Sequence, residues 1–177
     1  EKAMKKDPKN VRALNNLGEY NQEIGNEDLS ITYYEKALEI EPKNLRSKWL
    51  MMNTFPIIYK NFEQINYFKK HFEKNLKAIE NLVNENDIIE KKQILSALNS
   101  STNFYLHYHG DDITSLQKRY GAVVHKLTKH IYPEFHKKIP FNKSSKFIKV
   151  GFISSFFCEH VVSKLFKNWI IKLDKDR

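Results

Sequence analysis

A histidine near the carboxyl end of the sequence has the setting of a catalytic or substrate-positioning group. His160 follows a short apolar run and a turn-like segment, and it precedes a stretch with the apolar spacing of a helix. If the run is a strand, His160 lies where open α/β sheets bind ligands, beside the amide donors of a helix N-terminus. A neutral imidazole there could accept a proton from an attacking hydroxyl or position a polar substrate. The alternative is that His160 only caps the helix through a ring nitrogen.

Two other groups of side chains suggest chemistry, and we interpret both as structural. His107 and His109 would lie on one face of a strand, but no carboxylate or third ligand precedes Asp111 and Asp112. We therefore predict a packing role for this pair, and no metal ion or cofactor bound by the chain. The pair Ser154-Ser155 lacks the glycines of a nucleophile elbow and suits a tight turn.

A repeat at the amino-terminal end predicts how the chain begins to fold. The run Asp7-Pro8-Lys9-Asn10 recurs as Glu41-Pro42-Lys43-Asn44, at the period of about 34 residues typical of the tetratricopeptide repeat (TPR). Helix and turn positions of that motif are occupied by Leu14, Leu17, Gly18, Gly25, Ser30, Tyr34 and Ala37. Small residues there let two antiparallel helices approach closely, and Pro42 ends the second helix. Asn21 is an exception, since the motif prefers an aromatic side chain at its position.

The remainder is predicted as further helices, then one strand and one helix. Apolar spacings of three and four predict helices within residues 45–82, 88–98 and 113–129. One predicted stripe, interrupted at Pro56, contains Trp49, Met52, Phe55 and Tyr59. After a linker, residues 147–154 are predicted as a buried strand and residues 161–173 as a helix. A single parallel strand needs partners, so we expect further strands beyond the last residue of this chain.

Composition narrows the class of protein. Of 177 residues, 41% are hydrophobic and 13% are aromatic, which excludes a disordered chain. No apolar run is long enough to span a membrane, and a single cysteine, Cys158, fits a cytoplasmic protein. The net charge of +9 comes almost entirely from lysine. Because base and phosphate recognition favour arginine, we interpret this charge as a solvated surface and expect no nucleic-acid partner.

Several segments together resemble one family of enzymes. Residues 148–160, and the positions that follow them, are similar to the opening of the catalytic region in O-linked N-acetylglucosamine transferases and SPINDLY-type glycosyltransferases, especially the bacterial branch. Residues 103–110 and 117–121 resemble the helical segment that joins the TPRs to the catalytic part in that branch. The resemblance covers essentially the whole chain, and its specificity comes from the order and spacing of these segments.

The resemblance implies a mainly α chain with three parts. Residues 1–82 would form a TPR-type α-solenoid, residues 83–143 a connecting helical segment, and residues 144–177 the first βα unit of a Rossmann-like GT-B lobe. It also implies an inverting, metal-independent transfer of a sugar. The donor would be a nucleotide sugar such as UDP-GlcNAc, and the acceptor a Ser or Thr hydroxyl of a protein held by the TPRs.

The same resemblance assigns roles near the predicted strand. The family's loop histidine maps onto His160, and we predict Ser155 and Lys164 as substrate-binding residues on either side of it. Phe156 and Glu159 depart from the Asp and Asn common in relatives, which puts donor preference and activity in question.

Two functions are predicted, and they differ in class. The first is a protein O-glycosyltransferase, of which this chain would be a fragment, inactive alone because the donor-binding lobe is missing from it. The second is a non-enzymatic TPR adaptor whose groove binds an extended peptide or a partner helix.

Overall fold

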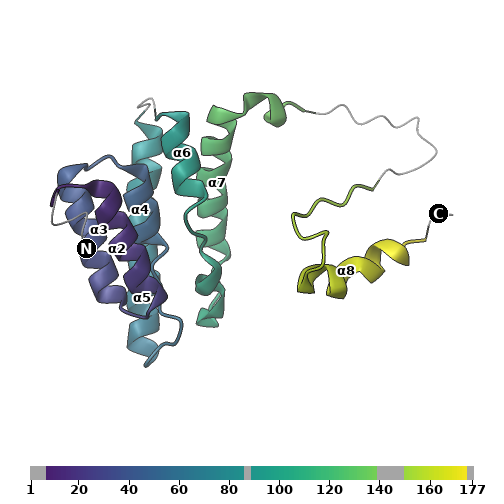
Figure 1. Ribbon diagram of the computed structural model, residues 1–177, viewed down its shortest axis with the longest axis horizontal. Helices are drawn as coiled ribbons and strands as arrows, with labels where there is room; N and C mark the ends of the chain where they lie inside the picture. The colour runs from purple at the N-terminus through teal and green to yellow at the C-terminus, as the bar shows by residue number, and fades with distance from the viewer. Residues whose placement is uncertain (1–6, 86–88, 139–149, 175–177) are drawn as a thin grey trace. The chain divides into compact units, whose positions relative to one another are not determined.

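All regular secondary structure in the described part of the protein is helical. The structure is a computed structural model that describes residues 7–85, 89–138 and 150–174. Its contacts divide the chain into two compact units, Glu1–Lys137 and Lys138–Arg177. The elements of the first unit are α2 (Val11–Glu23), α3 (Glu27–Ile40), α4 (Leu45–Met52), α5 (Phe62–Asn84), α6 (Lys91–Leu98), η1 (Phe104–His109), α7 (Thr114–Ile131) and η2 (Pro133–His136) (Figure 1). The second unit contains α8 (Val161–Ile171).

The repeated Pro-Lys-Asn run begins a helix in each of its copies. Asn10 Oδ1 accepts a hydrogen bond from the backbone N–H of Ala13 at 2.9 Å, and Asn44 Oδ1 accepts the equivalent bond from Ser47 at 2.9 Å. An asparagine at this position satisfies an N–H group of the first turn that has no partner within the helix. The sequence repeat therefore marks the starts of α2 and α4.

The α2–α3 hairpin closes around a glycine. A Cβ at Gly18 would lie 2.3 Å from a ring carbon of Tyr34, and the Tyr34 side chain is fully buried. No other residue type leaves room for this approach of the two helices. The turn between them uses Gly25 with φ of +79°, in the left-handed region that favours glycine. The predicted helices, turn and small-residue position of the repeat are confirmed.

The next helix, α4, ends after only eight residues. The side chains of Asn53 and Thr54 donate hydrogen bonds to the carbonyls of Trp49 and Leu50, at 3.0 Å each, just past its end. Such local bonds compete with the helical ladder, and Pro56 then prevents its continuation. Helix α4 therefore begins like α2 but is shorter, with 8 residues where α2 has 13.

This early end corrects one prediction. Phe55 and Tyr59 do not extend a helical stripe that begins at Trp49 and Met52, because the chain is irregular after α4. Phe55 is nevertheless buried, and its ring lies 5.7 Å from that of Phe72, measured between centroids. The side chains were correctly predicted as apolar core members, but the backbone that carries them was not.

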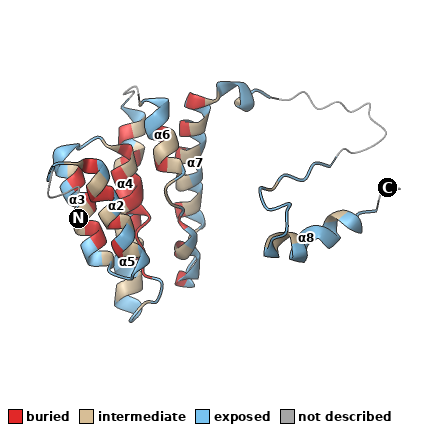
Figure 2. Ribbon diagram, in the orientation of Figure 1, coloured by how far each residue is buried: buried red, intermediate tan, exposed pale blue. Residues whose placement is uncertain are grey.

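One core cluster holds α3 to α7 together, and buried residues lie along their inner faces (Figure 2). Its members include Leu45, Trp49, Phe68, Phe72, Leu76, Ile79, Ile94, Leu106, Leu116, Val123 and Leu127. The Trp49 and Tyr120 rings are 5.3 Å apart between centroids, which joins α4 to α7. The helices predicted within residues 45–82 and 113–129 are confirmed by α5 and α7. Phe62, the first residue of α5, is an exception to the predicted apolar stripe, because it is 81% exposed. The boundary predicted after residue 82 falls within the last turn of α5, which ends at Asn84, and Leu82 itself belongs to this cluster.

The second unit departs from the predicted βα unit. Residues 150–154 form no strand, and residues 147–149 lie outside the described residues. A strand needs a hydrogen-bonded neighbour, and no segment of the described second unit supplies one. The turn from Ser155 and the helix α8 follow where they were predicted. No described residue of this unit is buried (Figure 2).

Candidate peptide-binding groove

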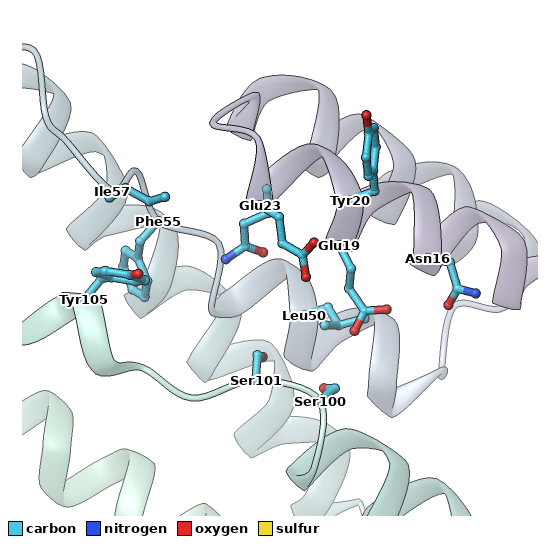
Figure 3. Close-up of a pocket in the computed structure, with 11 residues that line it drawn as sticks. Asn16, Glu19, Tyr20, Glu23, Leu50, Phe55, Ile57, Ser100, Ser101 and Tyr105 are labelled. Atoms are coloured by element: carbon cyan, nitrogen blue, oxygen red, sulfur yellow. The ribbon is translucent and has the colours of Figure 1, made fainter. Parts of the chain in front are cut away.

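A groove of about 620 Å³ opens along α2 in the first unit. Three stretches far apart in the sequence form it: α2, the end of α4 with the irregular segment after it, and the loop from α6 into η1 (Figure 3). It is lined by Asn16, Glu19, Tyr20, Gln22, Glu23, Leu50, Phe55, Ile57, Ser100, Ser101 and Tyr105. The groove therefore depends on the packing of α2 against the rest of the unit.

The groove has an apolar part and an acidic part. Phe55, Ile57 and Tyr105 lie together on one side in Figure 3. Glu19 and Glu23 extend from α2 toward Leu50 and the loop containing Ser100 and Ser101. Leu50 and Phe55 are each 1% exposed, whereas Ile57 is 56% exposed. The Ile57 side chain is thus available to a ligand, whereas Leu50 and Phe55 are already packed within the unit.

Hydrogen bonds between elements fix the walls of the groove. The Arg46 guanidinium binds both carboxylate oxygens of Glu19, at 3.0 and 2.9 Å, which joins α4 to α2. Gln22 Nε2 donates to the carbonyl oxygen of Asn53 at 3.1 Å. Trp49 Nε1 donates to the carbonyl oxygen of Ser101 at 3.0 Å and so anchors the loop before η1. Walls held in this way form a largely preformed site.

The groove is lined by apolar, acidic and neutral polar side chains. No histidine, cysteine or lysine is among the described residues that line it. Within residues 7–85, 89–138 and 150–174, no three His, Cys, Asp or Glu side chains gather closely enough to hold a metal ion. The lining therefore offers a ligand apolar surface, two carboxylates and several amide and hydroxyl groups.

The structure places His160 at the N-terminus of α8. Its Nδ1 accepts a hydrogen bond from the backbone N–H of Val162 at 3.2 Å, which is the capping role considered as the alternative. The Phe156 ring stacks on the imidazole, with centroids 4.3 Å apart and planes inclined by 19°. Because Nδ1 is the acceptor, the neutral ring carries its proton on Nε2 and offers a ligand a donor. Its catalytic assignment stays a prediction.

The other two predicted site residues lie near His160 in the chain. Ser155 lies in the turn before α8 and Lys164 in its first turn, and both are exposed. In the part of the second unit that the structure describes, no side-chain hydrogen bond links either of them to His160. Their substrate-binding role also stays a prediction.

The two histidines before Gly110 point to different partners. They lie on the 3-10 helix η1, not on a strand, so they do not share a face. His107 is exposed and its Nε2 accepts a hydrogen bond from the Gln117 amide at 2.8 Å. His109 is buried, and its Nε2 lies 2.6 Å from the Tyr59 hydroxyl. The predicted packing role is confirmed for His109.

Sequence reasoning missed the groove residues, although one signal for them was present. Glu19 and Glu23 are four residues apart, so they share a helix face, and that face lies away from the buried Leu14 and Gly18. The opposite wall could not be foreseen in the same way, since Ser100 and Ser101 reach α2 only through tertiary packing.

Comparison with known proteins supports the first hairpin. The family described as tetratricopeptide repeat matches residues 11–44, which span α2, α3 and the turn into α4. No curated protein and no solved structure matches the chain. The predicted TPR is therefore confirmed, and it indicates protein partners. In the described residues, no helix has the length and apolar character needed to cross a membrane.

Proposed function

We propose that the first unit is a protein-interaction module that holds an extended segment of a partner protein in the groove along α2. The observation that carries this proposal is the groove itself. It is bounded by the first helix of the matched repeat, and it combines exposed apolar surface with unused polar groups. TPR arrays commonly use such surfaces for extended peptides.

Selection from a phage-displayed library of random peptides against the 177-residue chain tests the proposal. Enriched peptides are synthesised with a fluorescent label, and their affinities are measured by anisotropy. Two adjacent isoleucines provide a matched pair. Ile57 lines the groove and is 56% exposed, whereas Ile58 does not line it and is 84% exposed. We expect Ile57→Ala to weaken binding about tenfold and Ile58→Ala to leave it unchanged. Equal effects of the two substitutions, or no enriched peptide, would contradict the proposal.

A second candidate is that the chain belongs to a protein O-glycosyltransferase. It rests on the resemblance of residues 148–160 to that family and is supported by a helix beginning directly after His160. In this view the groove holds the acceptor protein, and a nucleotide-sugar donor binds elsewhere in the longer enzyme. Ser155 and Lys164 would then contact substrate from the same turn and helix.

The enzyme candidate has its own test. The longer parent protein is incubated with labelled UDP-GlcNAc or GDP-fucose and a cell lysate, and protein-bound label is counted. His160→Ala should remove the incorporation, whereas His130→Ala, at an exposed position of α7, should not. Absence of protein-bound label with either donor would remove this candidate without affecting the interaction module.

A further inference from the structure

We infer that the groove along α2 selects a basic partner segment, in which a lysine or arginine lies beside an apolar side chain. The inference rests on the proposed interaction function and specifies the chemistry of its ligand. It is carried by the charge of the groove relative to the charge of the chain, and by the position of the apolar surface next to that charge.

The groove is an acidic region of a basic protein. The chain has a net charge of +9, yet the charged residues lining the groove are Glu19 and Glu23, and none of the described lining residues is Lys or Arg. Both carboxylates project from one face of α2 into the groove (Figure 3). A cationic side chain entering there gains attraction, whereas an acidic segment would meet charges of its own sign.

Arg46 neutralises only part of this charge. Its guanidinium pairs with Glu19 and also donates to Ser96 Oγ at 3.3 Å. The arginine itself lines a different cavity, of about 480 Å³, together with Arg12 and Lys92. Arg46 therefore approaches Glu19 from outside the groove. Glu23 is exposed and has no ion pair within the described residues, so its carboxylate remains available to a ligand.

The apolar half of the groove sets the second requirement. Ile57 and the ring of Tyr105 lie with the buried Phe55 on one side of the groove, and Glu23, Glu19 and Leu50 lie on the other side (Figure 3). The stem of a lysine or arginine covers such surface while its charged end reaches a carboxylate. A neighbouring apolar side chain of the ligand would then lie against Ile57. Together these contacts favour a mixed basic and apolar segment over a purely basic one.

The peptides enriched by the selection described above provide the test. We expect Lys or Arg to be over-represented next to an apolar residue. Each peptide is also made with its basic residue changed to Gln and to Glu. Glu23→Gln in the 177-residue chain should weaken binding of the parent peptide about tenfold. The matched control is Glu39→Gln, an exposed glutamate of α3 that does not line the groove. It should leave the affinity unchanged.

A charge exchange makes the assignment specific to one pair. Glu23→Lys should bind the parent peptide poorly and recover affinity for the version that carries Glu in place of its basic residue. If the enriched peptides lack basic residues and Glu23→Gln has no effect, while Ile57→Ala still weakens binding about tenfold, the charge inference is wrong and the interaction function stands. If no peptide is enriched, or binding ignores Ile57→Ala, both are wrong.

Discussion

Helices of the two units have similar apolar spacing, but their apolar side chains are buried in the first unit and exposed in the second. In α5 the side chains at spacings of three and four are buried, with Phe72 and Leu76 fully inaccessible. In α8 the same spacing leaves Leu165 65% and Trp169 70% exposed. The pattern is sufficient to give a helix in each case. Burial also requires a second apolar surface packed over the first, and no described residue of the second unit is buried in this way.

The largest expected effect compares the two tryptophans. Trp49 is 1% exposed and donates a hydrogen bond to Ser101, so Trp49→Ala should lower the free energy of unfolding by about 3–5 kcal/mol. Trp169→Ala should change it by less than about 0.5 kcal/mol, since this side chain is mostly exposed. Urea denaturation of the full chain, followed by circular dichroism, measures both. A large loss from Trp169→Ala would show that α8 has a packing partner and would break the comparison.

The next largest difference in stability is expected between alanine substitutions at two glycines, both of which lie in the first unit. Gly18→Ala would place a Cβ 2.3 Å from the buried Tyr34 ring, and should destabilise by about 1–3 kcal/mol. At Gly121, in the middle of α7, no atom lies within 4 Å of the added Cβ. Gly121→Ala should therefore stabilise by about 0.5–1 kcal/mol, because alanine is the better helix former. Thermal melting of both variants reports the sign directly, and equal signs would refute the close-contact argument.

Helix caps sharpen the comparison between units. Asn44→Ala removes the cap of α4 and should cost about 1 kcal/mol of the stability of the first unit. His160→Ala removes the cap of α8, but no residue of this helix is buried. It should therefore leave the cooperative unfolding transition where it was. A shift of the melting midpoint in His160→Ala comparable to that in Asn44→Ala would mean that the two units unfold together.

The smallest expected effect is a dependence of stability on pH, which arises from two histidines of the first unit. Burial lowers the pKa of both His71 and His109 below the ordinary value of 6.5, and for His109 the charge of Lys69 lowers it further. Between each lowered pKa and 6.5 the unfolded chain binds more protons than the folded chain. Stability should therefore be complete above about pH 6.5 and decline as pH falls below it. His71→Gln keeps a donor for the Met51 carbonyl and should flatten this decline in urea melts. An unchanged slope in His71→Gln would exclude His71 as its source.

The sequence allowed correct prediction wherever a local rule decides the outcome. The repeated Pro-Lys-Asn runs predicted the TPR helix pair, Gly18 predicted the close approach of its helices, and the apolar spacing predicted the helices α5 and α7. Prediction failed where polar side chains decide the end of a helix, because the spacing of apolar residues does not show that end. Asn53 and Thr54 end α4 through bonds to its own carbonyls, and no apolar pattern records this. The groove was missed for a related reason, since its walls come from three distant stretches.

Helix α2, the first helix of the repeat, buries fewer apolar side chains than α4 or α5. Its buried apolar residues, Val11 and Leu14, form a small cluster with Ala37, apart from the main core. Local opening of a helix costs the contacts that it alone must give up. Amide protons of α2 should therefore exchange with solvent before those of α4 or α5. Because α2 is also one wall of the groove, a bound segment would slow that exchange, and occupancy of the groove could be followed residue by residue along this helix.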